Sequence, residues 1–230
     1  MRSKTIRIVG AGLAGTEAAY QCAKQGLAVQ LFEMRPVRTT PAHQTADFAE
    51  LVCSNSLKSE SLNTAPWLLK EEMRRADSLL LRCAREAAVP AGHALAVDRD
   101  LFASKVTESI LAEPLIKVRR EEVTAIDEAD ADVLTVIATG PLTSDALANE
   151  IARLSGSSHL YFYDSISPIV ETDSIDMSRC YMAARYDKGT ADYINCPFTK
   201  EEYENFLDAL QSAQAVEEKD WEKLNYFEGC

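Results

Sequence analysis

TIRIVGAGLAG, residues 5–15, is the stretch that decides the fold of the first part of this chain. The β-branched residues of Thr5–Val9 predict a short buried strand, and small residues at helical spacing predict a helix over Leu13–Gln25. A second strand is expected over Ala28–Phe32. Strand, glycine turn, helix and strand form one βαβ unit, and its right-handed parallel crossover predicts an α/β, doubly wound, Rossmann-like sheet.

The glycines of this stretch have the spacing of a dinucleotide-binding loop. Gly10 permits the tight turn, Gly12 lets backbone amides approach a pyrophosphate at the helix N-terminus, and Gly15 allows the helix to pack closely on the strand. Glu33 ends the second strand, where a carboxylate can accept hydrogen bonds from a ribose diol. An acid at this place favours FAD or NAD(H) over NADP(H), and the alternative is a glycine-rich turn without a ligand. The predicted cofactor-binding residues here are Gly10, Ala11, Gly12, Leu13, Ala14, Gly15 and Glu33.

The rest of the chain is expected to contain both helices and strands. Apolar periodicity predicts helices over residues 66–87, 98–111, 144–154 and 200–210. Strands are expected at residues 116–119, 122–126, 133–139, 160–163, 180–186 and 192–196. Residues 133–139 are almost wholly apolar and should lie at the centre of the sheet, whereas residues 35–64 should form a long functional loop.

A domain boundary is expected at Gly156-Ser157-Ser158, the most linker-like point of the sequence. We therefore predict that residues 1–157 belong to a cofactor-binding domain. Residues 158–230 should begin an α+β insertion that serves the substrate.

The composition is that of a soluble globular protein, with 230 residues of which 47% are hydrophobic and 26% charged. No run approaches the roughly 18 apolar residues of a membrane helix, so we expect a cytoplasmic protein without membrane contact. The net charge of −12 is unevenly distributed, because residues 1–90 hold 12 basic and 9 acidic side chains. A polyanionic partner is therefore expected to bind the first part of the chain.

The six cysteines show no C-x-x-C spacing and the three histidines are scattered, so we expect reduced thiols and no metal site. Cys53 lies in a polar part of the long loop, where a lowered pKa would make it a nucleophile or a proton carrier. The basic residues expected near it are Arg35, Arg38 and Lys58. The alternative for Cys53 is a small buried hydrophobe. Structural roles are expected for Cys22, Cys83 and Cys196. His43 either contacts a cofactor or is a solvated loop residue, and we favour the second.

Longer strings are more specific than the glycine loop. In chain order they are FEMRP (32–36), TPAH (40–43), FAELVCSNS (48–56), LKEEMR (69–74), VPAG (89–92), AVDR (96–99), IATGPLTS (137–144), LYFYD (160–164) and FEGC (227–230). With them the chain resembles the folate- and FAD-dependent tRNA (uracil-5-)-methyltransferases, the TrmFO family, over essentially its whole length. The same strings separate it from the related, longer tRNA carboxymethylaminomethyl-uridine flavoproteins.

The resemblance implies a flavoprotein of the GR2 type that acts on the T-loop uridine of tRNA. Such an enzyme transfers the methylene group of methylene-tetrahydrofolate through reduced FAD to carbon five of the uracil, with NAD(P)H as reductant. The resemblance adds Val123 and Gly140 to the expected FAD-binding residues. It also makes Cys53 and Cys230 the catalytic pair. One thiol adds to carbon six and the other removes the proton from carbon five; the usual assignment gives the addition to Cys230, and the reverse stays open.

The family's chains continue for roughly as much again beyond the FEGC string, so we expect this chain to be the N-terminal portion of a longer protein. Two other functions stay open. One is an NAD(P)H-dependent flavin oxidoreductase without a role in RNA, and the other is an inactive fragment that binds FAD.

Overall fold

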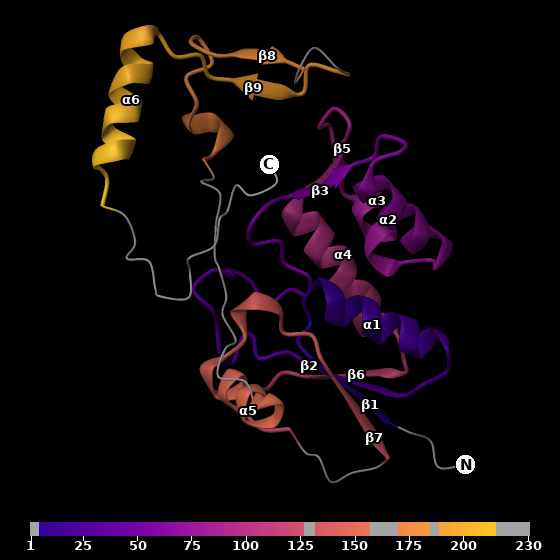
Figure 1. Cartoon of the computed structure of the whole chain (residues 1–230). Helices are drawn as coiled ribbons and strands as arrows, with labels where there is room; N and C mark the ends of the chain where they lie inside the picture. Colours follow the sequence, from indigo (N-terminus) through magenta and orange to yellow (C-terminus); the bar gives the residue numbers. More distant parts are fainter. Residues whose placement is uncertain (1–4, 127–131, 157–169, 185–188, 215–230) are drawn as a thin grey trace.

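A four-stranded parallel sheet forms the base of the first part of the molecule (Figure 1). The computed structural model describes residues 5–126, 132–156, 170–184 and 189–214. The strands are β1 (Thr5–Val9), β2 (Val29–Phe32), β6 (Ile116–Arg119) and β7 (Val133–Ile137), in the order β6-β2-β1-β7. β1 pairs in parallel with both β2 and β7. The predicted βαβ unit and α/β class are confirmed.

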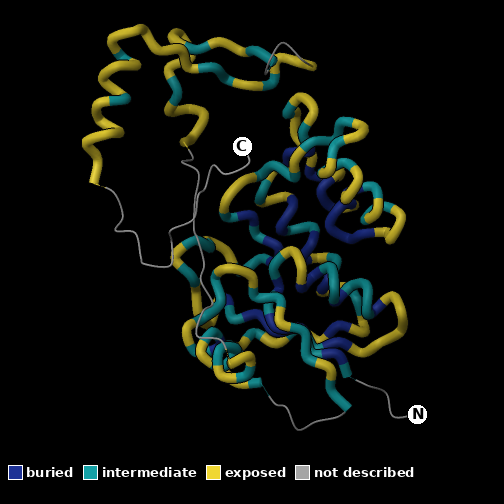
Figure 2. Tube along the Cα trace, in the orientation of Figure 1, coloured by how far each residue is buried: buried dark blue, intermediate teal, exposed yellow. Residues whose placement is uncertain are grey.

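Helices cover one face of this sheet in two tiers. α1 (Leu13–Lys24) and α4 (Arg99–Ala112) pack on the strands, and α3 (Leu79–Glu86) packs on both helices farther from the sheet. Figure 2 shows the buried segments gathered where these elements meet. Ile8, Leu31 and Phe102 are fully buried there, so the apolar core holds the carboxyl ends of β1 and β2 in place.

A second, antiparallel sheet lies in the order β3-β5-β4. It consists of β3 (Ser56–Ser59), β4 (Ala88–Val89) and β5 (Ala94–Val97). The prediction of an unbroken loop over residues 35–64 was therefore wrong at β3. Strands of two to four residues that pair across a long sequence distance carry too short a pattern to be recognised from periodicity.

The single helix predicted over residues 66–87 is in fact two helices, α2 (Ala65–Arg75) and α3. Asp77 between them has a φ of 55°, and the Ser78 side chain caps α3 by accepting from the amide of Leu81. Glu17 of α1 also accepts from Ser78 Oγ and from the first amides of α3. The break was missed because the apolar face continues across it.

The strand predicted over residues 133–139 is present as β7, but its predicted central position was wrong, and so was the strand predicted over residues 122–126. Within the described residues β7 pairs with β1 alone and lies at the edge of the sheet, with Leu134 57% exposed. Residues 122–126 are extended but join no ladder, and the amide of Ile126 instead donates to the carboxylate of Glu150 in α5 (Asp145–Ser155).

The remaining elements are β8 (Tyr181–Ala183), β9 (Tyr193–Asn195) and α6 (Lys200–Ser212), with short 3-10 turns at Gly140–Leu142 and Thr172–Ser174. β8 and β9 form an antiparallel pair. It contacts the first part at the β4–β5 loop, where the amide of Gly92 donates to Asp192 and the Tyr193 hydroxyl donates to the carbonyl of Ala91.

The strand predicted at residues 160–163 lies outside the described residues, and the boundary between residues 157 and 158 stays a prediction. None of the described helices has the length and apolar character required to cross a membrane.

Candidate functional site

The glycine loop between β1 and α1 has the backbone that its sequence demands. Gly10 has a φ of 98°, and a Cβ there would lie 2.6 Å from the carbonyl oxygen of Ala138. A Cβ on Gly15 would lie 1.8 Å from the carbonyl oxygen of Gly10. Both glycines are therefore required by the fold itself, because the loop, β7 and α1 approach one another too closely for a side chain.

Gly12 differs from these two glycines. A Cβ built on it meets no atom within 4 Å, so no steric contact within the described part of the chain demands a glycine here. Gly12 is the N-cap residue of α1, with no capping side chain and no acidic residue in the first helical turn. The positive end of the helix therefore faces open space, which is the arrangement that binds an anion such as a pyrophosphate.

A pocket of about 550 Å³, which includes space open to solvent, lies beside this loop. Its walls contain Gly10, Ala11, Gly12, Glu33 and Val123, all of which were predicted for cofactor binding. The other four predicted residues do not line it. Leu13 and Ala14 face a separate apolar groove, Gly15 lies beneath the loop, and Gly140 follows Thr139, which is in the wall.

Glu33 lies at the pocket wall but is only 6% exposed, and its carboxylate is already engaged. Oε2 accepts from the amide of Ala11 at 3.2 Å, while Oε1 accepts from the amide and from Nε of Arg35 at 3.0 Å each. Burial acts to raise the pKa of Glu33, but the hydrogen bonds and charge of Arg35 and the amide of Ala11 outweigh it, so this pKa is lowered. A ribose diol at Glu33 would share the carboxylate with these partners.

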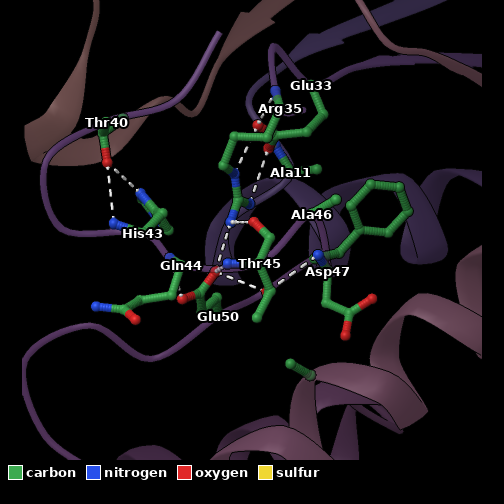
Figure 3. A network of polar contacts seen from close by, with 12 residues as sticks. Ala11, Glu33, Arg35, Thr40, His43, Gln44, Thr45, Ala46, Asp47 and Glu50 are labelled. Atoms are coloured by element: carbon green, nitrogen blue, oxygen red, sulfur yellow. Dashed lines mark hydrogen bonds and ion pairs between the residues drawn. The ribbon is translucent and has the colours of Figure 1, made fainter. Parts of the chain in front are cut away.

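Arg35 lies between two carboxylates (Figure 3). It is 2% exposed, and its Nη1 contacts Glu50 Oε2 at 2.9 Å on the side opposite Glu33. Glu50 also accepts from the amides of Gln44 and Thr45, and these bonds overcome the effect of burial and lower its pKa. The network joins the glycine loop, the end of β2 and the 44–50 loop.

Arg120 closes this network from the β6 side. Its guanidinium lies over the Phe48 ring at 4.2 Å and donates to the carbonyl oxygens of Arg35 and Ala46. Sequence reasoning missed both arginines as parts of the site. Neither position carries a local pattern that specifies its partners, because Glu50, Phe48 and Ala46 lie in a loop whose path the sequence leaves open.

His43 also lines the pocket and is half-buried, contrary to the prediction of a solvated loop residue. Its Nδ1 lies 2.7 Å from Thr40 Oγ1. Burial and then the nearby charge of Arg35 lower the pKa of His43, so the imidazole is neutral at neutral pH.

Cys53 is exposed in the loop before β3 and is not a wall residue of the pocket. Two of the basic groups expected near it bind carboxylates elsewhere: Arg35 as above, and Arg38 with Glu122 at 2.7 Å. Two hydrogen bonds fix the segment after Cys53 to β5. Asn55 Nδ2 donates to the carbonyl oxygen of Val97, and the amide of Val97 donates to the carbonyl oxygen of Asn55. Cys230 lies outside the described residues, so whether the two cysteines meet stays a prediction.

Comparison with known proteins gives consistent results. The profile of the family described as glucose inhibited division protein A matches residues 5–230. A curated methylenetetrahydrofolate--tRNA-(uracil-5-)-methyltransferase TrmFO from Koribacter versatilis (strain Ellin345) is 75% identical, over 98% of this chain and 50% of the relative. One of the same name from Solibacter usitatus (strain Ellin6076) is 60% identical, over 99% of this chain and 52% of the relative.

The chain therefore spans about half the length of the curated relatives it matches. Among solved structures, the GidA-related protein from Thermus thermophilus gives a TM-score of 0.41 with 16% identity, over 66% of this chain and 68% of that chain. A similarity of that size supports no conclusion about the site.

Proposed function

Because this chain belongs to the family of glucose inhibited division protein A, we propose that it contributes the FAD site and one reactive cysteine of a methylenetetrahydrofolate–tRNA-(uracil-5-)-methyltransferase. The single observation that carries the cofactor part of this proposal is the open space at Gly12, beside the uncapped N-terminus of α1. The fold does not require a glycine at this position. A ligand phosphate that lies close to the backbone would explain why one is present, because a side chain there would be in its way.

The pocket residues fit an FAD molecule. The loop from Gly10 to Gly15 would hold the pyrophosphate, Glu33 the ribose, and the backbone of Val123 the adenine. When bound, FAD supplies the redox chemistry that delivers and reduces the one-carbon unit. Methylene-tetrahydrofolate as carbon donor and NAD(P)H as reductant complete the proposed reaction, which would take place in the cytoplasm.

The chain's own residues prepare this site before any ligand binds. Arg35 fixes Glu33, and Glu33 in turn holds the amide of Ala11 in the glycine loop. The loop therefore keeps its shape without the ligand, which lowers the ordering cost of binding. His43, which also lines the pocket, is neutral and adds no positive charge to the pocket wall.

Cys53 is the residue that we assign to the uracil chemistry. Carbon five of uracil becomes nucleophilic enough only after a thiolate adds to carbon six, and a base must later remove the carbon-five proton. Cys53 is exposed, and the CSNS segment that carries it is fixed to β5. It is thus accessible to a base flipped out of the T-loop and can serve as one of these two groups, with Cys230 as the other.

Replacement of Cys53 tests the function. The protein with Cys53→Ala should retain FAD but lose T-loop uridine methylation by at least about a hundredfold, the usual size of an acid–base contribution. Cys22→Ala, which alters a half-buried cysteine of α1, is the matched control and should methylate at the normal rate. If Cys53→Ala also methylates normally, the proposal is wrong. NAD(P)H oxidation that is indifferent to tRNA and survives Cys53→Ala would instead indicate a flavin oxidoreductase.

A further inference from the structure

Two cysteines far from the glycine loop lie side by side at the end of the β8–β9 hairpin. Cys180 Sγ is 3.4 Å from Cys196 Sγ and donates a hydrogen bond to it. The ladder register pairs Tyr181 with Asn195, so Cys180 and Cys196 are the next directly opposed positions. Opposed residues of antiparallel strands have Cα atoms about 4.5–5.5 Å apart, which is inside the range that a disulfide spans.

Both sulfur atoms can be reached from solvent. Cys196 is exposed and Cys180 half-buried, and both line an open hollow of about 660 Å³, which includes space open to solvent. A structural role was predicted for Cys196 because it precedes Pro197 at the end of a strand, but its side chain is exposed. Of the other two cysteines with a predicted structural role, Cys83 is buried and Cys22 is half-buried.

The charged groups around the hollow are already paired. Arg179 forms an ion pair with Glu202 at the start of α6, and Asp176 accepts from the amide and hydroxyl of Ser178. No cluster of three or more metal-ligating side chains is found among the residues that the structure describes, so the cysteine pair lacks the further ligands of a zinc site. Reaction between the two sulfur atoms is the chemistry that this geometry favours.

We propose that Cys180 and Cys196 form a reversible disulfide when the protein meets a hydroperoxide. The proposal goes beyond the methyltransferase reaction and does not depend on it. The site uses neither Cys53 nor any residue of the glycine-loop pocket. Its effect would be to tie the turn before β8 to the residues that lead into α6.

The chemistry balances in two steps. The thiolate of Cys196, the more exposed sulfur, attacks the O–O bond of the hydroperoxide, which gives a sulfenic acid on Cys196 and releases the alcohol, or water in the case of hydrogen peroxide. The thiol of Cys180 then attacks the sulfenic sulfur, the S–S bond forms and one water leaves. Two thiols and one hydroperoxide thus give one disulfide, one alcohol and one water, and a dithiol reverses the oxidation.

Trypsin separates the two cysteines and makes the bond directly visible. Cleavage after Arg179, Arg185, Lys188 and Lys200 places Cys180 in CYMAAR and Cys196 in GTADYINCPFTK. The protein is treated with a small excess of hydrogen peroxide, its free thiols are blocked with iodoacetamide, and the unreduced digest is examined by mass spectrometry. We expect these two peptides to be joined, two hydrogens lighter than their sum, and to separate again after dithiothreitol.

Variants sharpen the test. With Cys180→Ser the joined peptide should be lost and Cys196 should accumulate as sulfenic or sulfinic acid, whereas Cys22→Ser should leave the yield of the joined peptide unchanged. The proposal is overturned if both peptides are recovered singly alkylated after peroxide has already oxidised Cys53. It is equally overturned if Cys180 or Cys196 joins a different cysteine in preference.

Discussion

Arg35 and Glu33 form a buried, forked ion pair, with Arg35 Nε 3.0 Å from Glu33 Oε1 and Nη2 3.3 Å from Oε2. The same carboxylate accepts from the amide of Ala11, so Glu33 connects the guanidinium of Arg35 to the glycine loop. A loop that consists of small residues has no side chains of its own to fix it. The pair supplies that support, and its removal should affect both stability and binding.

Replacing Arg35 by Met should destabilise the protein strongly. The change leaves Glu33 and Glu50 without their shared cation, and breaking a buried pair costs about 3–5 kcal/mol. The free energy of unfolding in urea measures this loss. Arg75→Met is the matched control: Arg75 is 80% exposed in its pair with Glu71, and its loss should cost less than about 1 kcal/mol. Equal losses in the free energy of unfolding for the two substitutions would show that the buried Arg35 network stabilises the protein no more than an exposed ion pair does.

The pH dependence of stability should reveal Glu33. Its pKa is lowered from 4.5 in the folded state, so the unfolded chain binds the proton more readily as the pH falls. The stabilisation is therefore present above about pH 4.5 and is lost as the pH falls through the lower folded pKa. Glu33→Gln should cost about 1.5–3 kcal/mol at pH 7, the worth of hydrogen bonds to a charged group.

As the pH falls below about 4.5, the gap between the wild-type protein and Glu33→Gln should narrow, because the unfolded wild-type chain takes up the proton first and the folded carboxyl follows only at lower pH. Urea unfolding at pH 7, 5, 4 and 3.5 follows this difference. A gap that stays constant over the whole range would mean that the ionised form of Glu33 has no part in stability.

Gly15→Ala should disturb the junction of β1 and α1. The added methyl group would lie 1.8 Å from the carbonyl oxygen of Gly10, which is backbone and cannot rotate away. We expect a loss of more than about 2 kcal/mol, since overpacking here must move the helix. Thermal unfolding measures it, with Gly156→Ala as a comparison in which the positive φ of 65° opposes the side chain and no atom of the described residues lies within 4 Å of it. A Gly15→Ala protein of normal stability would contradict the described packing.

Lys70 should stabilise the segment that follows Cys53. Its buried ammonium group donates to the carbonyl oxygens of Leu57 and Ser59 at 2.7 and 2.8 Å. Lys70→Met keeps the aliphatic stem but leaves these acceptors unpaired, at an expected cost of about 1–3 kcal/mol. Amide hydrogen exchange of β3 should accelerate in the variant. If exchange and unfolding are both unchanged, Lys70 does not hold this strand.

The βαβ unit was predictable because each of its signals is local. The apolar strand, the positive φ of Gly10, the close contact of Gly15 with Gly10 and the small residues of α1 all lie within about thirty residues, and the structure contains all of them. The contact of Gly10 with Ala138 is the one steric demand of the unit that comes from farther along the chain. The break between α2 and α3 was also accessible in principle, because Ser78 is a capping residue that lies inside an apolar pattern.

Other features depend on pairings that no local pattern specifies. The position of β7 at the sheet edge is decided by which strands pair with it, and the apolar character of its residues does not determine that. The contacts of Arg35 with Glu50 and of Arg120 with Phe48 cross loops whose path the sequence leaves open. The approach of Cys180 to Cys196 requires the register of a hairpin with strands of only three residues.

FAD binding by Gly12→Ala is the most direct test of the central claim. The Cβ meets no atom within 4 Å in the described chain, so the free energy of unfolding without ligand should match that of the wild-type protein. Titration with FAD, followed by flavin fluorescence, should nevertheless show affinity reduced by at least about tenfold, which corresponds to about 1.4 kcal/mol. Unchanged affinity, with a variant that folds normally, would contradict the assignment of the cofactor to this loop.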